Sequence, residues 1–233
     1  MSLQYNVISA TCKGPQVEHI YQDHLRVVET QTCLLAVVAD GLGAVTSSAR
    51  GSELICMILS EMAAIVCWEV HDFPEMLNTA VSEWYRRLES KNIDPRNCCT
   101  TCSAVVINKL ERIAYLCQIG DSPIFWRSDH KKMETMCTEK DFLNETICLG
   151  TSQKPTFIVN TRKFEGAFDF MVASDGFGDE VIPEIADAMF DYFINKYKKV
   201  RPKHRNSALK QELLTTIQKI NNDDKSLIFG WIC

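Results

Sequence analysis

Two apolar runs in the sequence end in the same way, and this repeated ending constrains the fold more than any other feature. Residues 34–44 read LLAVVADGLGA, and residues 168–178 read FDFMVASDGFG. Each run has the apolar content of a buried strand, and each stops at an Asp-Gly pair. One such pair is ordinary turn chemistry. Two buried strands that both end on a carboxylate require a shared reason.

The spacing of apolar residues predicts short strands interrupted by pairs of helices. Strands are expected at 4–11, 24–29, 33–39, 100–109, 112–119, 123–127, 156–161, 168–174 and 225–232. Helices are expected at 47–67, from Pro74 to about Lys91, from Pro183 to about Lys199, and at about 207–221. The centre of the chain lacks the strict strand–helix alternation of a doubly wound sheet. The pattern therefore predicts an α+β layered sandwich.

Composition indicates one globular domain that spans residues 1–233. Hydrophobic residues make up 46% of the chain and charged residues 24%, which allows a sizeable core. The formal net charge of −5 argues against a surface that binds nucleic acid. No apolar stretch reaches the roughly 18 residues of a membrane span, and no secretory signal follows Met1. We therefore expect neither nucleic acid nor a membrane as a partner.

The sequence contains eleven cysteines, most of them inside apolar runs. This distribution indicates reduced, buried thiols in a cytoplasmic protein rather than a disulfide framework. Cys99 and Cys102 have C-x-x-C spacing, but they lead into a predicted strand instead of the helix that a thioredoxin-like site requires. We expect both to pack in the core.

Carboxylates recur where predicted strands begin or end. They are Asp23, Asp40, Asp121, Asp175 and the pair Asp223 and Asp224. If these strand ends converge, two charges about 4 Å apart repel by roughly 4 kcal/mol at an effective dielectric near 20. Such a cluster needs protons or cations, and clustered oxygen ligands suit Mg²⁺ or Mn²⁺. Glycine after the acid permits close approach of the backbone to a metal, or a positive φ. The alternative is that each acid only caps a turn.

Four motifs, in order and approximate spacing, resemble the metal-dependent protein phosphatases of the type 2C (PPM) family. They are VVADGLGA, QIGDSPIFW, FMVASDGFGDEV and DDKSLIFGWI. YQDH at 21–24 is similar to the N-terminal acidic motif of the family, and SSARGSELI and NETICLG are similar to segments of its bacterial branch. The resemblance covers essentially the whole chain. It implies a four-layer αββα sandwich of two antiparallel sheets flanked by helix pairs.

The resemblance also implies a centre of two Mn²⁺ or Mg²⁺ ions at one edge of the sandwich. Asp40 would bridge the two metals, and the carbonyl of Gly41 would ligate one of them. Asp175 and Asp223 would ligate the other. Asp121, together with Asp175, would match an optional third metal of the family.

Catalysis in such a centre would need no covalent enzyme intermediate. Paired cations lower the pKa of a bridging water, orient it toward phosphorus and neutralise charge on the phosphoryl oxygens. Asp23 would hold metal-bound water, so Asp23, Asp40 and Asp175 are the expected catalytic residues. The implied substrate is a phosphorylated protein, the product of a Ser/Thr kinase.

The selection of Asp223 over Asp224 rests on the register of the final strand. The family places its ligand three residues before a Ser or Thr that opens this strand, and Ser226 fills that place. Successive side chains of an extended segment point to opposite faces. Asp224 is therefore expected to face solvent or to cap the preceding turn, and its replacement to cost little.

Two positions depart from the family pattern. Glu18 stands where many eukaryotic relatives have an arginine that grips phosphate, and Leu42 stands where some relatives have a histidine proposed as general acid. His19 and His24 flank Asp23 and could supply a proton, or they could be surface or structural histidines. Two hypotheses follow: an active phosphatase for phosphoserine and phosphothreonine, or a catalytically weak or silent relative that acts as a regulatory or interaction module.

Overall fold

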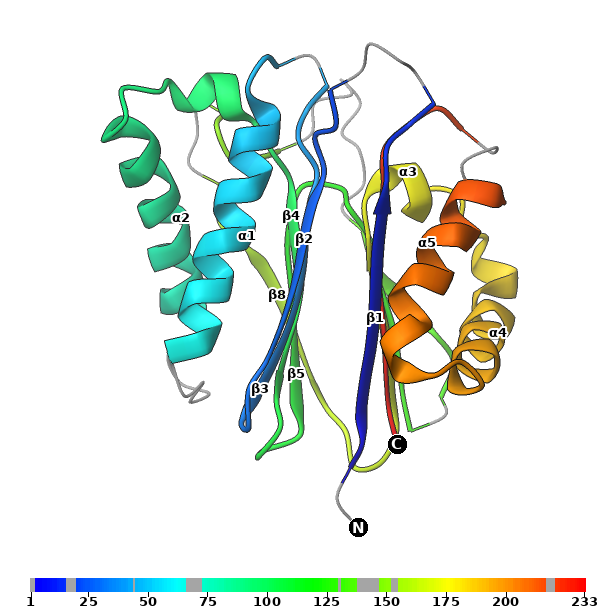
Figure 1. Ribbon diagram of the computed structural model, residues 1–233. Coiled ribbons are helices and arrows are strands. Elements are labelled where there is room, and N and C mark those ends of the chain that lie inside the picture. Colours follow the sequence, from blue (N-terminus) through cyan, green and yellow to red (C-terminus); the bar gives the residue numbers. More distant parts are fainter. Residues whose placement is uncertain are drawn as a thin grey trace.

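A computed structural model gives the structure of the chain and describes residues 3–15, 20–43, 45–65, 73–129, 131–137, 147–151, 155–216 and 221–233. These residues form two five-stranded antiparallel sheets, with helices on the outer face of each (Figure 1). One sheet has the order β1-β10-β9-β6-β7 and the other β2-β3-β4-β5-β8. The strands are β1 (Tyr5–Cys12), β2 (His24–Glu29), β3 (Cys33–Ala39), β4 (Cys102–Asn108), β5 (Ile113–Ile119), β6 (Ile124–Ser128), β7 (Glu134–Met136), β8 (Ile158–Lys163), β9 (Phe168–Ala173) and β10 (Lys225–Ile232). The helices are α1 (Ser48–Ile65), α2 (Phe73–Glu89), α3 (Asp175–Gly178), α4 (Ala186–Lys198) and α5 (Arg205–Thr215), with 3₁₀ turns at Pro95–Cys98, Pro183–Ile185 and Pro202–His204.

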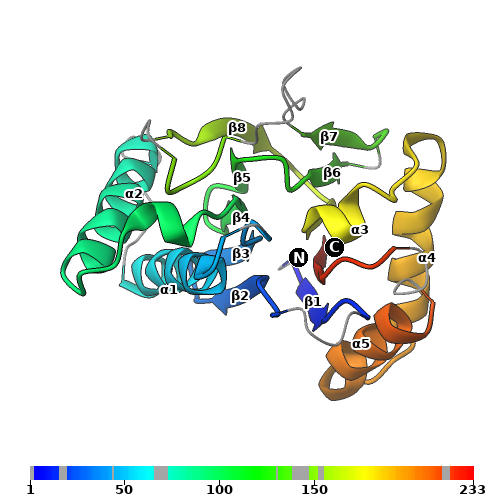
Figure 2. The ribbon, with the colours of Figure 1, turned by 90° about the horizontal axis from the view of Figure 1, so that it is seen from above.

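The layers follow the order helix pair, sheet, sheet, helix pair, as the view from above shows (Figure 2). α1 and α2 cover the outer face of the sheet that contains β3, and α4 and α5 cover the sheet that contains β10. This arrangement confirms the expected four-layer αββα sandwich.

β3 illustrates why an inner strand is apolar along its whole length. Its odd-numbered residues, from Cys33 to Ala39, join the core cluster formed with α1 and α2. Its even-numbered residues, from Leu34 to Val38, pack between the two sheets. Both faces are therefore buried, and no polar residue alternates with the apolar ones.

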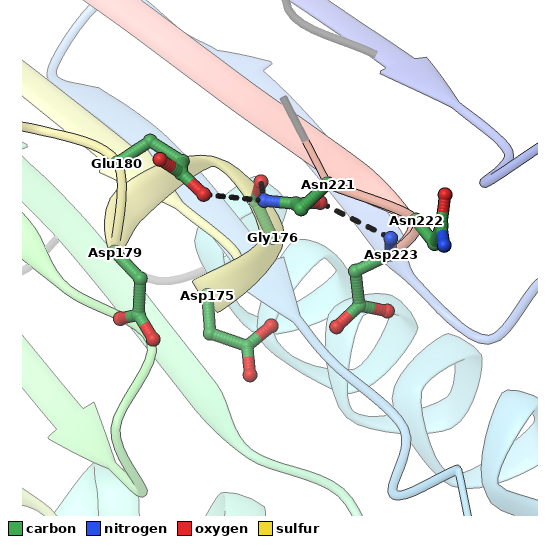
Figure 3. Close-up of a pocket in the computed structure, with 7 residues that line it drawn as sticks. All are labelled: Asp175, Gly176, Asp179, Glu180, Asn221, Asn222 and Asp223. Carbon is green, nitrogen blue, oxygen red and sulfur yellow. Dashed lines mark hydrogen bonds between the residues drawn. The ribbon is translucent and has the colours of Figure 1, made fainter. Parts of the chain in front are cut away.

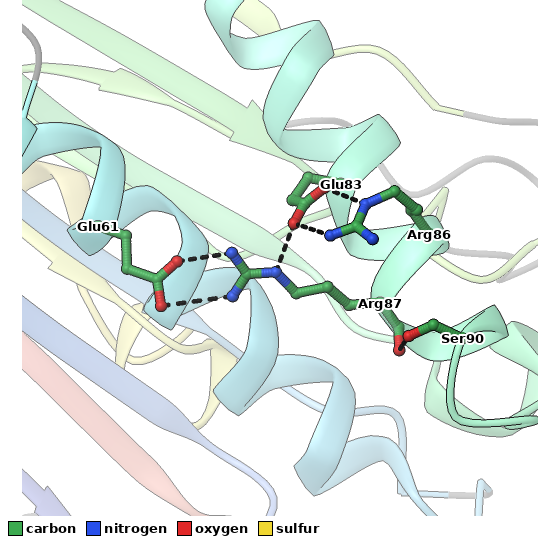
Figure 4. Close-up of polar contacts among 5 residues, drawn as sticks. All are labelled: Glu61, Glu83, Arg86, Arg87 and Ser90. Atoms are coloured by element: carbon green, nitrogen blue, oxygen red, sulfur yellow. Dashed lines mark hydrogen bonds and ion pairs between the residues drawn. The ribbon is translucent and has the colours of Figure 1, made fainter.

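Charged side chains connect the two helices on the outer face of the β3 sheet. Arg87 of α2 donates hydrogen bonds to both carboxylate oxygens of Glu61 of α1, at 2.7 and 3.3 Å (Figure 4). Its Nε donates to Glu83 at 2.6 Å, and Arg86 binds the same carboxylate. A partly exposed network of this kind contributes modestly to stability. It fixes the relative position of α1 and α2 at the surface.

Two short elements were not expected from the sequence. α3 begins directly at Asp175, after Ser174 in the N-cap position, although its glycines suggest only a turn. β7 has three residues and pairs with β6. The helix expected at about 207–221 ends at Thr215 in α5, and residues 217–220 lie outside the described part of the chain.

The cysteines of the described residues are free, and eight of these ten are buried. Cys102 is fully buried in the core beneath α1 and α2, and Cys99 is 8% exposed, so core packing of this pair is confirmed. Cys67 lies outside the described residues. No helix among those described combines the length and apolar character needed to cross a bilayer.

Candidate metal centre

The structure brings the predicted metal ligands together around one cavity of about 210 Å³. The cavity is lined by Gln22, Asp40, Gly41, Leu42, Gly43, Thr101, Asp121, Asp175, Asp223 and Asp224. These residues come from strand ends and turns that are distant in sequence, as the convergence hypothesis requires. Their role as metal ligands stays a prediction.

A second cavity, of about 460 Å³, continues from the first and shares Asp175 and Asp223 with it. Its remaining lining residues are Gly176, Asp179, Glu180, Asn221 and Asn222 (Figure 3). Figure 3 shows the carboxyl groups of Asp175 and Asp223 directed to the same side. The two cavities together form an acidic depression at the end of the sandwich where α3 lies.

The N-terminal end of β4 holds the backbone of Asp40 in place. The N–H of Thr101 donates to the Asp40 carbonyl at 2.8 Å, and the N–H of Asp40 donates to Thr101 Oγ1 at 3.1 Å. The Thr100 hydroxyl donates to the same carbonyl at 2.8 Å. These three bonds fix the loop on which the Asp40 carboxyl group enters the cavity.

Gly41 and Gly176 follow the two strand-end acids because a Cβ atom would not fit. A Cβ on Gly41 would lie 2.8 Å from the carbonyl carbon of Ser48, and one on Gly176 would lie 2.1 Å from the carbonyl oxygen of Asp224. Neither glycine adopts a positive φ. The positive φ considered for these positions is therefore wrong, and the close approach of other backbone segments explains the repeated Asp-Gly pair.

Asp23 lies behind the cavity wall and is 1% exposed. Its carboxyl group is close to the carboxyl group of Asp40 and to the hydroxyl groups of Ser174 and Ser226. Burial raises its pKa to about 7, against the opposing effect of hydrogen bonds with these three residues. At neutral pH, this carboxyl group can therefore hold or release a proton.

The pKa values of Asp40 and Asp175 are also raised. Burial raises the pKa of Asp40 well above its usual range, and the negative charges of Asp23 and Asp175 raise it further. Burial likewise raises the pKa of Asp175, together with the charges of Asp223 and Asp121. Each of these acids is close enough to its neighbours for their negative charges to oppose its ionisation.

These carboxylates fit a hard cation that keeps part of its water shell. Asp23 Oδ2 and Asp175 Oδ1 are buried and have no hydrogen-bond partner among the described residues. Such oxygens are costly to leave unsatisfied, and a cation at Asp175 and a water at Asp23 would satisfy them. In the described part of the chain, no group of three or more His, Cys, Asp or Glu side chains could hold a metal as it stands. Mg²⁺ and similar ions usually keep several waters, and such waters can lie between an ion and some of these carboxylates.

Asp224 differs from the sequence prediction. It is 3% exposed, and its carboxylate accepts hydrogen bonds from the backbone N–H groups of Gly14, at 2.8 Å, and Gln22, at 2.9 Å. It therefore neither faces solvent nor caps the preceding turn. It joins the start of β10 to the segment that leads to Asp23.

The two departures from the family pattern have different outcomes. Leu42 lines the cavity, so an apolar side chain occupies this part of its wall. Glu18 and His19 lie outside the described residues.

His24 is not among the lining residues of the smaller cavity. Its Nδ1 lies 2.9 Å from the Ser52 hydroxyl of α1, and burial lowers its pKa. His24 is thus a structural histidine.

Gln22 and Thr101 were not recognised from the sequence as part of the site. Gln22 is next to Asp23 in YQDH and donates to Ser48 Oγ at 2.6 Å, which joins the cavity wall to the start of α1. Its position next to Asp23 is the one sequence feature that could have indicated its place in the site. The sequence does not distinguish Thr101 from other strand residues, because threonine is common in strands.

The model of the protein phosphatase 2C family matches residues 16–214. The chain belongs to this family. A search of curated protein sequences finds no match to this type 2C phosphatase family member.

Solved structures of bacterial phosphatases share the fold of this type 2C family member. A serine/threonine phosphatase of S. agalactiae has 16% sequence identity and a TM-score of 0.73, over 98% of each chain. Stp1 from Staphylococcus aureus has 17% identity and a TM-score of 0.71, over 99% of this chain and 95% of its own. The catalytic domain of PstP, in complex with two manganese ions, has 15% identity and a TM-score of 0.69, over 99% of each chain.

Proposed function

We propose that the chain is a Mn²⁺- or Mg²⁺-dependent phosphoprotein phosphatase that hydrolyses phosphoserine and phosphothreonine. The observation that carries this proposal is the convergence of Asp40, Asp121, Asp175 and Asp223 on one cavity, with buried Asp23 behind it. Membership of the type 2C family and the serine/threonine phosphatases among its structural neighbours support the reaction class. We further propose that residues 1–233 act as one phosphatase domain in the cytoplasm.

Five residues would hold the ions. Asp40 and the carbonyl of Gly41 would ligate one ion, and Asp40, Asp175 and Asp223 would ligate the other, while Asp121 would serve a third together with Asp175. PstP with two manganese ions and a magnesium complex of RsbX, whose structure also resembles this chain, support the choice of metals. Bound ions would acidify a water and stabilise charge that develops on the phosphoryl oxygens.

The remaining chemistry depends on residues of the chain. Asp23 is buried, and its Oδ2 atom has no hydrogen-bond partner among the described residues, so it can accept a hydrogen bond from a water at the cavity. The larger adjoining cavity leaves room beside Asp175 and Asp223 for the polypeptide that carries the phosphoryl group. Leu42 offers no proton to the leaving oxygen, so solvent would protonate it.

Turnover of phosphopeptides and p-nitrophenyl phosphate tests the proposal. The purified chain should hydrolyse them with Mn²⁺ or Mg²⁺ and should stop when EDTA is added. Asp40→Asn provides the matched inactive control, because it removes the ligand shared by both ions. Absence of turnover with either ion across all substrates would reject the enzyme hypothesis and favour the interaction module.

A further inference from the structure

Asn221 lies two residues before Asp223 and connects this segment to the one that carries Asp175. Its Nδ2 group donates to the carbonyl oxygen of Gly176 and to Glu180 Oε1, both at 2.9 Å (Figure 3). Its Oδ1 atom accepts from the N–H of Asp223 at 3.1 Å and from Lys225 Nζ at 2.5 Å. An asparagine amide has two N–H donors and two acceptor sites, and all four are used here.

Lys225 is fully buried at the start of β10, where an apolar side chain would suit the core. Its ammonium group donates to Asn221 Oδ1, to the Asp223 carbonyl at 2.9 Å and to the Asn221 carbonyl at 3.3 Å. An ammonium group has three donors, so this turn satisfies all of them. A buried charge is tolerated only when it is bonded in this way. Lys225 therefore binds the turn at 221–223 through three hydrogen bonds.

These contacts form one connection between the two acids. Gly176 directly follows Asp175, and Asn221 binds both its carbonyl oxygen and the backbone N–H of Asp223. The Asp223 carboxylate is itself oriented, because its Oδ1 accepts from the N–H of Asp224 at 2.9 Å. The distance and direction between the two carboxyl groups thus depend on the Asn221 amide, and Lys225 keeps that amide in place.

We propose that Asn221 and Lys225 are positioning residues that set Asp175 and Asp223 at the separation needed to bind a divalent ion. This inference rests on the proposed function, since it assigns those two acids to the ion. Groups that orient metal ligands without touching the metal typically contribute 10- to 100-fold to metal affinity. Loss of either residue should therefore weaken Mn²⁺ binding even in a folded protein.

Mn²⁺ affinity of the full chain, measured by electron paramagnetic resonance and by calorimetry, tests the proposal. Asn221→Ala and Lys225→Met should each raise the Kd for Mn²⁺ by about tenfold or more. The control is Asn195→Ala, an exposed asparagine of α4 that lines neither cavity; its Kd should stay within about twofold of wild type. The double variant Asn221→Ala/Lys225→Met should lose less affinity than the two single effects multiplied, because both changes break the same connection.

Urea unfolding in EDTA separates this role from a merely structural one. Variants that unfold at lower urea concentration but keep the wild-type Kd for Mn²⁺ would overturn the inference and leave the proposed function intact. A wild-type chain that binds no Mn²⁺ would overturn the proposed function itself. If Asn221→Ala does not fold, the Kd for Mn²⁺ of Asn221→Ser, which retains a small polar group, tests the same inference.

Discussion

Asp223 and Asp224 are consecutive in sequence, but their carboxyl groups have opposite environments. Asp223 is exposed and lines both cavities, whereas Asp224 is 3% exposed and accepts two backbone hydrogen bonds. Both acids line the smaller cavity, but the Asp223 side chain is open to solvent, whereas the Asp224 carboxylate is bound by two backbone N–H groups. One is therefore available to an ion, and the other stabilises the fold.

Asp224→Asn should destabilise the protein by about 1–3 kcal/mol, in contrast to the small cost expected from the sequence. An asparagine has one acceptor oxygen, so either the Gly14 or the Gln22 N–H would face an NH₂ group and lose its partner. Urea unfolding in EDTA measures the change. Asp223→Asn is the matched control, and its unfolding free energy should change by less than about 0.5 kcal/mol.

In a Mn²⁺ titration of activity, we expect the larger effect from Asp223→Asn and the smaller effect from Asp224→Asn. Asp223→Asn should raise the Mn²⁺ concentration needed for activity by orders of magnitude, because it removes a proposed ligand. Asp224→Asn should raise it much less in the protein that remains folded. An opposite order in the titration would show that the register of the site is wrong by one residue.

Asp40→Asn should abolish Mn²⁺-dependent turnover and should stabilise the metal-free protein. The side chain is close to Asp23 and Asp175, which oppose its ionisation, and its neutral replacement removes this repulsion. A gain of roughly 1 kcal/mol corresponds to less than one pKa unit of unfavourable interaction. Thermal unfolding in EDTA and phosphopeptide turnover measure the two effects. Wild-type turnover in this variant would reject the assignment of Asp40.

The metal-free protein should lose stability as pH rises from about 4 to about 7. The pKa of Asp23 is about 7 in the folded chain and 3.8 ordinarily, so the folded state holds its proton more tightly than the unfolded state. The stabilisation is complete below the lower value and is lost as pH rises through the higher one. For one group, the slope is at most about 1.4 kcal/mol per pH unit.

Urea unfolding across this pH range, with EDTA, checks the sign. Mn²⁺ should reverse the trend at the upper end, because ligation favours ionised carboxylates. Asp23→Asn should flatten the metal-free profile. Stability that rises with pH in EDTA would contradict the burial of a protonated acid at this position.

Gly176→Ala should destabilise the chain by about 1–3 kcal/mol, the usual cost of overpacking. Its Cβ would lie 2.1 Å from the carbonyl oxygen of Asp224, so β10 and α3 would have to separate. Gly166→Ala is the control, because its nearest neighbour, Asp129 Oδ1, would lie at 3.5 Å. Denaturant midpoints of both variants test the difference, and equal midpoints would contradict the tight contact.

The layers of the fold can be predicted from the sequence because they depend on local patterns. The run from Cys33 to Ala39 is apolar on both faces, and only a strand between two layers has that requirement. Convergence of Asp40 and Asp175 can also be anticipated, since both follow inner strands with the same Asp-Gly ending. By contrast, α3 cannot be predicted from the sequence, because the residues around Gly176 are typical of a turn.

Residues that act through distant backbone atoms cannot be predicted in this way. The partners of Asp224 are N–H groups of Gly14 and Gln22, more than 200 residues earlier, and any residue supplies an N–H. The role of Asn221 depends likewise on a carbonyl of α3. Only the three-dimensional arrangement distinguishes such residues from ordinary turn residues.

β10 is the second of five strands in its sheet, between β1 and β9, although it follows both of them in the sequence. While the polypeptide is still emerging from a ribosome, β1 has no hydrogen-bonded neighbour within its described sheet until β10 is made. Asp23, Asp40, Asp121 and Asp175 emerge earlier, but Asp223 arrives only with the start of β10. Before β10 is made, a nascent chain can thus assemble the β2-β3-β4-β5-β8 sheet with α1 and α2. It cannot complete the acidic cavity, because Asp223 is still missing. The proposed ion site would therefore be completed in one step, when β10 inserts between β1 and β9, and not gradually during translation.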